Sequence, residues 1–134
     1  MTAAASKKWG QKFYTDVILT TYFAALDRGD VETAVSCFED TATLICETDG
    51  TRLDGKEAIR AFLQQITDES QGMNHEVTNL VVDMQNRRCA AELHYSDQLT
   101  TGTELDMDNC NFFDFGTDGR FTRVRFWTGA SVEG

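Results

Sequence analysis

The chain has 134 residues, 41% of them hydrophobic and 25% charged, which is typical of a single globular domain with one core. Its formal net charge is −10, and this argues against nucleic acid or an anionic membrane as a partner. No apolar stretch approaches the ~18 residues that span a bilayer, and the first residues lack the apolar segment of a signal peptide. We therefore expect one cytoplasmic domain over residues 1–134, with residues 1–8 flexible.

The first half of the chain predicts three helices. Apolar residues recur at intervals of three and four over residues 9–27, which indicates an amphipathic helix. Gly29 is suited to end this helix and Asp30 to cap the next, at about 31–39. A short hairpin with a turn at 48–50 follows. Asp54 and Glu57 then resemble a capping box at the start of a third helix that runs to about 66.

The second half predicts long strands at 74–84, 88–99, 103–115 and 120–127, joined mostly by tight turns. Helices followed by antiparallel strands indicate an α+β fold. A strongly twisted sheet can curl around a helix and leave a cone, which is a ligand pocket unless side chains fill it.

The alternation of side chains shows which residues share a face in each strand, but it does not show equally clearly in every strand which face lines the interior. Residues of one face of 103–115 are Leu105, Met107, Asn109, Asn111, Phe113 and Phe115. In 74–84 both faces are apolar, with His75 on one face and Leu80, Val82 and Met84 on the other. In 88–99 the face that lines the interior stays open, although Leu93 and Tyr95 favour the one opposite His94. We expect solvated carboxylates at Asp97, Asp106, Asp108 and Asp114.

The four cysteines have no Cys-x-x-Cys spacing. A metal site or a disulfide framework is therefore not indicated, and buried free thiols are expected. The residues in question are Cys37, Cys46, Cys89 and Cys110.

Five segments resemble the NTF2-like superfamily and, within it, the SnoaL-like and ketosteroid-isomerase-like branch. They are YFAALDRGDVETAV at 22–35, FEDTATL at 38–44, DGKEAIRAFL at 54–63, HEVTNLVVD at 75–83 and FFDFGTDGRFTRV at 112–124. The resemblance implies a cone-shaped, cystatin-like α+β barrel, with three N-terminal helices on a curved, mostly antiparallel sheet. It also implies a homodimer formed through the outer face of the sheet, with His75 facing inward and Leu80, Val82 and Met84 facing outward. It does not fix the function, because this fold hosts isomerases, cyclases, dehydratases, epoxide hydrolases and binding modules.

Two branches of the superfamily fit the sequence poorly. The ketosteroid isomerases use a tyrosine on the first helix, an acid on the first strand and a donor on the fifth, and these positions hold Tyr22, Cys46 and Asn111. A thiol cannot replace the carboxylate without a strong activating partner. The epoxide hydrolases need an Asp-Arg-Asp set. The matching positions hold Glu92, His94 and Phe126.

The dehydratase and cyclase branches fit better. They use a tyrosine on the first helix, a histidine after the third helix and sometimes an aspartate near the tyrosine, and Tyr22, His75 and Asp27 match. A histidine can remove a proton next to a carbonyl and return it to a leaving hydroxyl, while a tyrosine polarises the carbonyl.

Two asparagines on an otherwise apolar face predict contacts with the substrate. Asn109 and Asn111 are costly to bury unpaired, so they either pair with each other and with Tyr22 or His75, or they face a wet pocket. In a pocket they could hold a substrate oxygen. The predicted substrate contacts are Asn109, Asn111, His94, Phe113 and Trp127.

The leading hypothesis is an enzyme without metal or cofactor that acts on a small apolar oxygenated molecule, such as a polyketide, terpenoid or steroid-like compound. The reaction would be an acid/base isomerisation, cyclisation or dehydration. The competing hypothesis is a non-catalytic module that binds a small ligand or a protein. An open cavity with His75 and Asn111 favours the enzyme, whereas a cone filled by Phe113, Phe115 and Trp127 favours the binding module.

Overall fold

The computed structural model describes residues 9–129 of the chain, so the expectation for residues 1–8 lies outside the described part. The first helical rod consists of α1 (Gln11–Thr15), the π-helical segment η1 (Asp16–Phe23) and α2 (Ala24–Asp27). Two more helices follow, α3 (Val31–Ser36) and α4 (Lys56–Asp68). The strands are β1 (Phe38–Cys46), β2 (Thr51–Asp54), β3 (Asn74–Asp83), β4 (Arg88–Gln98), β5 (Glu104–Phe115) and β6 (Phe121–Trp127).

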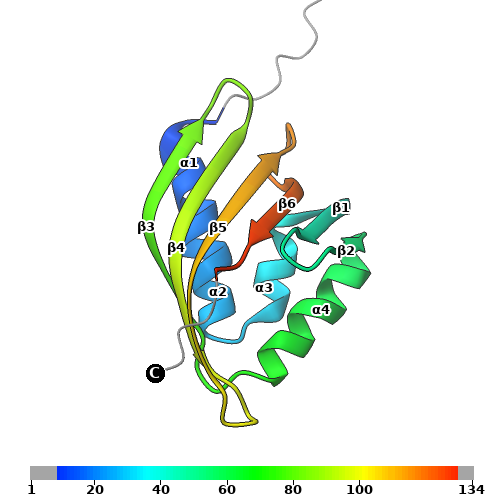
Figure 1. The fold of residues 1–134 in the computed structure, drawn as a ribbon. Coiled ribbons are helices and arrows are strands. Elements are labelled where there is room, and N and C mark those ends of the chain that lie inside the picture. Colours follow the sequence, from blue (N-terminus) through cyan, green and yellow to red (C-terminus); the bar gives the residue numbers. More distant parts are fainter. Residues whose placement is uncertain (1–8, 130–134) are drawn as a thin grey trace, which may run out of the picture.

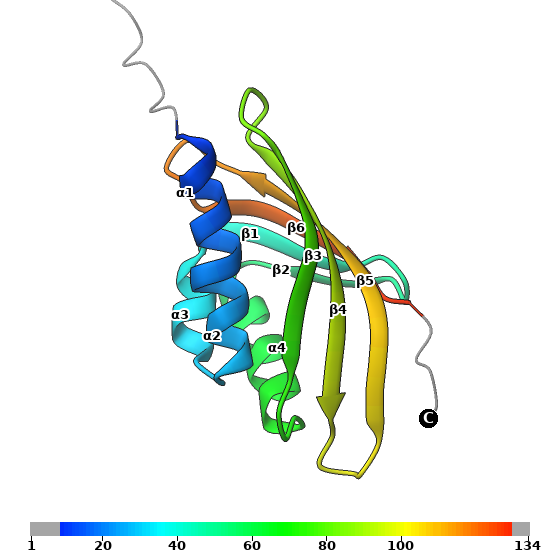
Figure 2. The same cartoon turned by 90° about the vertical axis from the view of Figure 1, so that its left-hand side faces the viewer.

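The strands form one six-stranded sheet in the order β2-β1-β6-β5-β4-β3. All neighbours are antiparallel except β1 and β6, which are parallel. The helices lie on one face of the sheet, and the long strands β3, β4 and β5 bend along the helical rod (Figures 1 and 2). The predicted α+β fold with a curved, mostly antiparallel sheet is confirmed. No helix within residues 9–129 is long and apolar enough to cross a membrane.

The junction between α2 and α3 forms as predicted. Gly29 has a φ of +76°, the left-handed conformation that glycine adopts without a steric cost. The side chain of Asp30 accepts a hydrogen bond from the Thr33 backbone N–H at 3.1 Å and caps α3.

The predicted capping box at the start of α4 is wrong. The N-cap residue is Gly55, and no side chain caps the helix. Asp54 belongs to β2 instead, and its carboxylate lies 3.0 Å from the Arg52 guanidinium. Because Gly55 has a φ of +90° and donates its N–H to the Ala42 carbonyl, the turn is closed by backbone bonds.

A β-bulge in β3 changes the predicted strand faces. Val77 pairs with Leu93 and Asn79 with Glu92, so one extra residue stands between them on β3. The alternation is therefore inverted after the bulge, and Leu80 and Val82 pack against the core. The expectation that these two face outward is wrong. Met84 lies in the turn after β3 and is 48% exposed, and Val81 on the outer side of β3 is 56% exposed.

Aromatic side chains fill much of the core. Tyr22 meets the rings of Phe38, Phe113 and Phe121 at centroid distances of 5.6, 6.1 and 5.2 Å. These four side chains are at most 3% exposed. Aromatic rings thus fill the interior on one side of Tyr22, whereas a cavity lined in part by α4 remains open.

Candidate functional site

An apolar cavity of about 210 Å³ lies between the helices and the inner face of the sheet. Its walls come from η1, α2, α4, β1 and the strands β3 to β6. The polar side chains in the lining are Tyr22, His75, Tyr95, Asn109, Asn111 and Thr128. Phe113, Phe115 and Trp127 do not line the cavity, so they do not plug it.

Asp27 and His75 form a hydrogen-bonded pair at the edge of this cavity. His75 Nδ1 lies 2.6 Å from Asp27 Oδ1, and the His75 backbone N–H lies 3.1 Å from each carboxylate oxygen. A carboxylate only accepts hydrogen bonds, so Nδ1 carries the hydrogen, and in the neutral ring Nε2 keeps its lone pair. The ring is stacked on Phe23 at 4.7 Å and touches Tyr95 edge-on at 4.9 Å. The pair is therefore an oriented imidazole whose Nε2 is available as a base.

Tyr22 and Asn111 supply unpaired polar groups to the same cavity. Within residues 9–129 neither the Tyr22 hydroxyl nor the Asn111 amide has a hydrogen-bond partner, although their exposures are only 3% and 8%. Burial, and to a lesser extent the nearby Cys37, raises the pKa of Tyr22 above its ordinary value. The hydroxyl therefore stays protonated and can donate. The asparagines were expected either to pair with each other and with Tyr22 or His75, or to face a pocket. The Asn111 amide faces the pocket.

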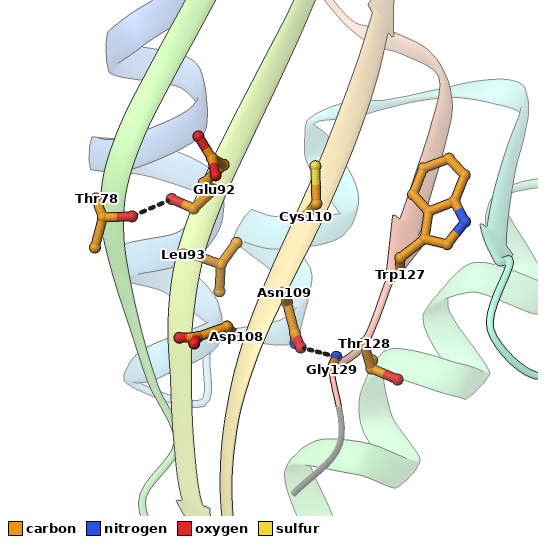
Figure 3. Close-up of a pocket in the computed structure, with 9 residues that line it drawn as sticks. All are labelled: Thr78, Glu92, Leu93, Asp108, Asn109, Cys110, Trp127, Thr128 and Gly129. Atoms are coloured by element: carbon orange, nitrogen blue, oxygen red, sulfur yellow. Dashed lines mark hydrogen bonds between the residues drawn. The ribbon is translucent and has the colours of Figure 1, made fainter.

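Asn109 lies between the cavity and a second hollow on the outer face of the sheet. Its Oδ1 accepts a hydrogen bond from the Gly129 N–H at 3.2 Å. Figure 3 shows this contact at the edge of the outer groove, whose lining also includes Glu92, Cys110 and Trp127. Asn109 lines both hollows, but one of its polar atoms is already engaged.

A model of the SnoaL-like domain family matches residues 19–124. The chain belongs to this family. No curated protein sequence matches it significantly. Among solved structures, the chain is similar to a candidate polyketide cyclase of Xanthomonas campestris, with 21% identity and a TM-score of 0.77 over 87% of this chain and 90% of that one.

Two further solved structures carry activities in their descriptions. One is the epoxide hydrolase/cyclase-like enzyme SalBIII, described for pyran ring formation in the polyether salinomycin, with 17% identity and a TM-score of 0.78 over 89% of this chain and 92% of that one. The other is an LEH-like epoxide hydrolase of M. tuberculosis, with 15% identity and a TM-score of 0.74 over 87% of this chain and 83% of that one. At these identities the likeness shows the SnoaL-like fold alone.

Three predicted substrate contacts of this SnoaL-like chain lie elsewhere. Phe113 is fully buried in the aromatic core. Trp127 is 37% exposed on the outer face, where the Arg125 guanidinium lies 5.3 Å from its ring. His94 also points outward, because Cys89, Ala91 and Leu93 form the buried face of β4, and its ring contacts the carboxylates of Asp106 and Asp108.

Tyr95 and Asp97 belong to the neighbourhood of the site although neither was predicted. The Tyr95 ring lines the cavity, and its hydroxyl donates to Asp97 Oδ2 at 2.8 Å. Asp97 is 7% exposed, so the expectation of a solvated carboxylate is wrong. The sequence does contain a signal for the burial of Asp97. This residue follows Leu93 and Tyr95 at intervals of two, so all three side chains lie on the inner face of the strand.

All four cysteines are free thiols. Cys46, at the position of the isomerase carboxylate, is buried, and burial raises the pKa of its thiol. It does not line the cavity. Burial likewise raises the pKa of Cys37 to about 11 and that of Cys89 to about 12. Residues 9–129 contain no group of three or more His, Cys, Asp or Glu side chains placed to hold a metal ion.

Proposed function

We propose that this SnoaL-like protein is an enzyme that moves a proton within a small, largely apolar, oxygenated molecule. The observation that carries the proposal is the Asp27–His75 pair at 2.6 Å in the wall of an apolar cavity that also contains the unpaired groups of Tyr22 and Asn111. A base held by a carboxylate, and donors without partners in an apolar surrounding, are the parts that acid/base chemistry next to a carbonyl requires.

In the proposed step, His75 Nε2 accepts a proton from a carbon next to the substrate carbonyl, and the C–H electron pair moves into an enolate. The resulting imidazolium is stabilised by Asp27, which accepts from Nδ1–H. Tyr22 and Asn111 donate to the enolate oxygen. His75 then returns the proton to another carbon, which gives isomerisation, or to a departing hydroxyl, which gives dehydration. If the substrate carries a second carbonyl, the enolate carbon can instead attack its carbon. The C=O π pair then moves onto that oxygen, which takes the proton from the His75 imidazolium, and a ring is closed.

The size of the cavity supports a small substrate. A volume of about 210 Å³ lies between the ~150 Å³ of an engineered cavity that holds benzene and the ~300–1,000 Å³ typical of drug-sized ligands. The best fit is a molecule of one or two rings, or the reacting end of a longer one. The descriptions of the cyclase-like neighbours support cyclisation among the three reactions, as an analogy between folds.

The alternative is a module that binds such a molecule without turning it over. The thiol of Cys46, at the position of the isomerase carboxylate, supports it. In either case we propose that two copies pair through the outer face of the sheet. Support for this pairing comes from the exposed apolar side chains of Val81, Met84, Phe112 and Trp127.

The deciding experiment starts with mass spectrometry of the small molecule that co-purifies with the protein, followed by turnover assays on that compound and its relatives. We expect His75→Ala to lower turnover about 10²–10⁴-fold, and Asp27→Asn to lower it by up to about 10⁴-fold because the amide permits the wrong tautomer. The matched control is His94→Ala, which removes the other of the two histidines from the outer face and should leave turnover unchanged. If the ligand binds equally well and turnover does not change in His75→Ala, the assignment of His75 as the base is wrong.

A further inference from the structure

Asp97 is a buried carboxylate for which the proposed reaction has no direct use. It lies at the inner face of β4 and is 7% exposed. Each of its oxygens accepts one hydrogen bond, from Ser70 Oγ at 2.6 Å and from the Tyr95 hydroxyl at 2.8 Å. Burying a carboxylate costs several kcal/mol unless its partners compensate. The two partners that offset this cost show to which parts of the site the carboxylate is connected.

The first partner, Ser70, belongs to the segment that leads from α4 into β3. Its Oγ also accepts from the Gly72 N–H at 3.1 Å. The same segment is bonded to the end of β4 through Gln71 N–H to the Gln98 carbonyl at 2.7 Å. This segment ends where β3 begins, and His75 is the second residue of β3. One oxygen of Asp97 therefore helps to fix the backbone that carries His75.

The second partner, Tyr95, touches His75 directly. Its ring lies edge-on to the imidazole at a centroid distance of 4.9 Å, and Phe23 stacks on the imidazole at 4.7 Å. The Tyr95 hydroxyl has one hydrogen, and Asp97 accepts it. Burial, followed by the bond to Asp97, raises the pKa of Tyr95, so the hydroxyl keeps this hydrogen at neutral pH. The Tyr95 ring is therefore held at its hydroxyl by Asp97 and packs at its edge against the His75 ring.

We propose that Asp97 is a positioning residue of the site, which acts through Tyr95 to hold the His75 ring in its orientation. The inference rests on the proposed function of His75 as the group that transfers the proton. Two carboxylates then serve one imidazole. Asp27 binds Nδ1 directly, and Asp97 anchors the tyrosine whose ring packs edge-on against the imidazole.

A double-mutant cycle on the ligand-free full chain tests this inference. The variants are Asp97→Asn, Tyr95→Phe and their combination, all in a His94→Gln background that leaves His75 as the single histidine. The readouts are the chemical shifts and line widths of the His75 ring signals at one neutral pH, which report how the imidazole is oriented and how firmly it is held. An amide cannot accept two hydrogen bonds from donors on both of its ends, so Asp97→Asn releases or reverses one of the two bonds.

We expect Asp97→Asn to shift and broaden the His75 ring signals, because the tyrosine that packs edge-on against the imidazole loses its anchor. In the Tyr95→Phe background the same substitution should change these signals less than half as much. Removal of a negative charge acts through space in both backgrounds, whereas the part carried by Tyr95 disappears with its hydroxyl. Ser70→Ala is the matched control, because it removes the other bond and should affect unfolding without moving the His75 ring signals.

Equal effects of Asp97→Asn in the two backgrounds, or none in either, would show that Asp97 only supports the backbone. If Asp97→Asn does not fold, Tyr95→Phe alone decides the matter. This substitution keeps an aromatic ring packed against His75 but removes its bond to Asp97. A His75 ring signal that is broader than in the Tyr95 protein supports the proposal, and an unchanged signal overturns it. No substrate enters these measurements. A failure to find turnover therefore refutes the proposed function without touching this result, and the reverse also holds.

Discussion

Replacing Asn111 by leucine should make the protein more stable and a poorer binder. The amide is 8% exposed and has no hydrogen-bond partner within residues 9–129. A buried polar group without a partner costs about 1–3 kcal/mol. Because Asn111 borders the cavity, water can satisfy part of the amide, and we expect a gain in the free energy of unfolding near the lower limit, about 1 kcal/mol. Leucine has nearly the same shape, so the substitution should create neither a void nor a clash.

Asn109 provides the matched control on the same face of the same strand. Its Oδ1 accepts from the Gly129 N–H at 3.2 Å. Asn109→Leu therefore removes a bond that is made and leaves that N–H without its acceptor, which should cost about 1 kcal/mol. The two substitutions are chemically identical and lie two residues apart, so the sign of the change isolates the effect of the missing partner.

Urea unfolding of both variants measures the two free energies, provided that the slope of the transition does not change. Calorimetry with the co-purified compound then measures affinity, which should fall about tenfold or more in Asn111→Leu, corresponding to ~1.4 kcal/mol. If Asn111→Leu is as destabilising as Asn109→Leu, the amide has a partner in solution and the reasoning fails. A stabilised variant that loses the ligand would mark Asn111 as a residue kept for binding at a cost in stability.

Two further predictions concern the outer face and a turn. The hydrogen bond to Asp108, more than any other cause, raises the pKa of His94. A raised pKa in the folded state stabilises the protein below the unfolded value of about 6.5, and this contribution is lost as the pH rises through the folded value. Asp108→Asn should thus lower the unfolding midpoint at pH 6 but not at pH 9, and a pH-independent change would contradict this. Gly119→Ala should cost more than Gly102→Ala in thermal unfolding. Both positions have a positive φ, which costs a residue with a Cβ about 1–2 kcal/mol, but a Cβ at Gly119 would lie 2.6 Å from Phe13 Cζ, whereas Gly102 has open space. Equal losses would mean that Phe13 moves aside freely.

The fold was predictable where local chemistry decides the structure. Gly29 and Asp30 end one helix and cap the next because of properties that each residue carries alone. The bulge in β3 was not predictable, since no residue near Thr78 marks it and both faces of the strand are apolar. The register there is chosen by tertiary packing, which places Leu80 and Val82 in the core.

The site was predictable in part, for a similar reason. Asn111 was found because an amide on an apolar face is unusual, and that reasoning needs only the alternation of one strand. Asp27 and His75 were predicted as site residues from the family resemblance. Their contact was not predictable from local sequence, because the two residues are 48 positions apart and lie on different elements. His94 and Trp127 lie on the outer face of the sheet, away from the cavity. Their position was not predictable because the packing of the whole sheet decides which face of a strand points inward. Asp97 was missed because a carboxylate is assumed to be solvated unless its partners are known.

The position of Asp27 links folding and chemistry in one side chain. It lies in the last turn of α2, where the partial negative charge of the helix end disfavours a carboxylate. Its bonds to His75 offset this, since it accepts both from the backbone N–H that starts β3 and from the ring. His75→Ala removes the ring and keeps the backbone bond, so its effect on turnover can be separated from its effect on stability. Asp27→Asn weakens both. The imidazole of His75, whose orienting carboxylate also fastens the helix to the sheet, is therefore held at the cavity by the fold itself.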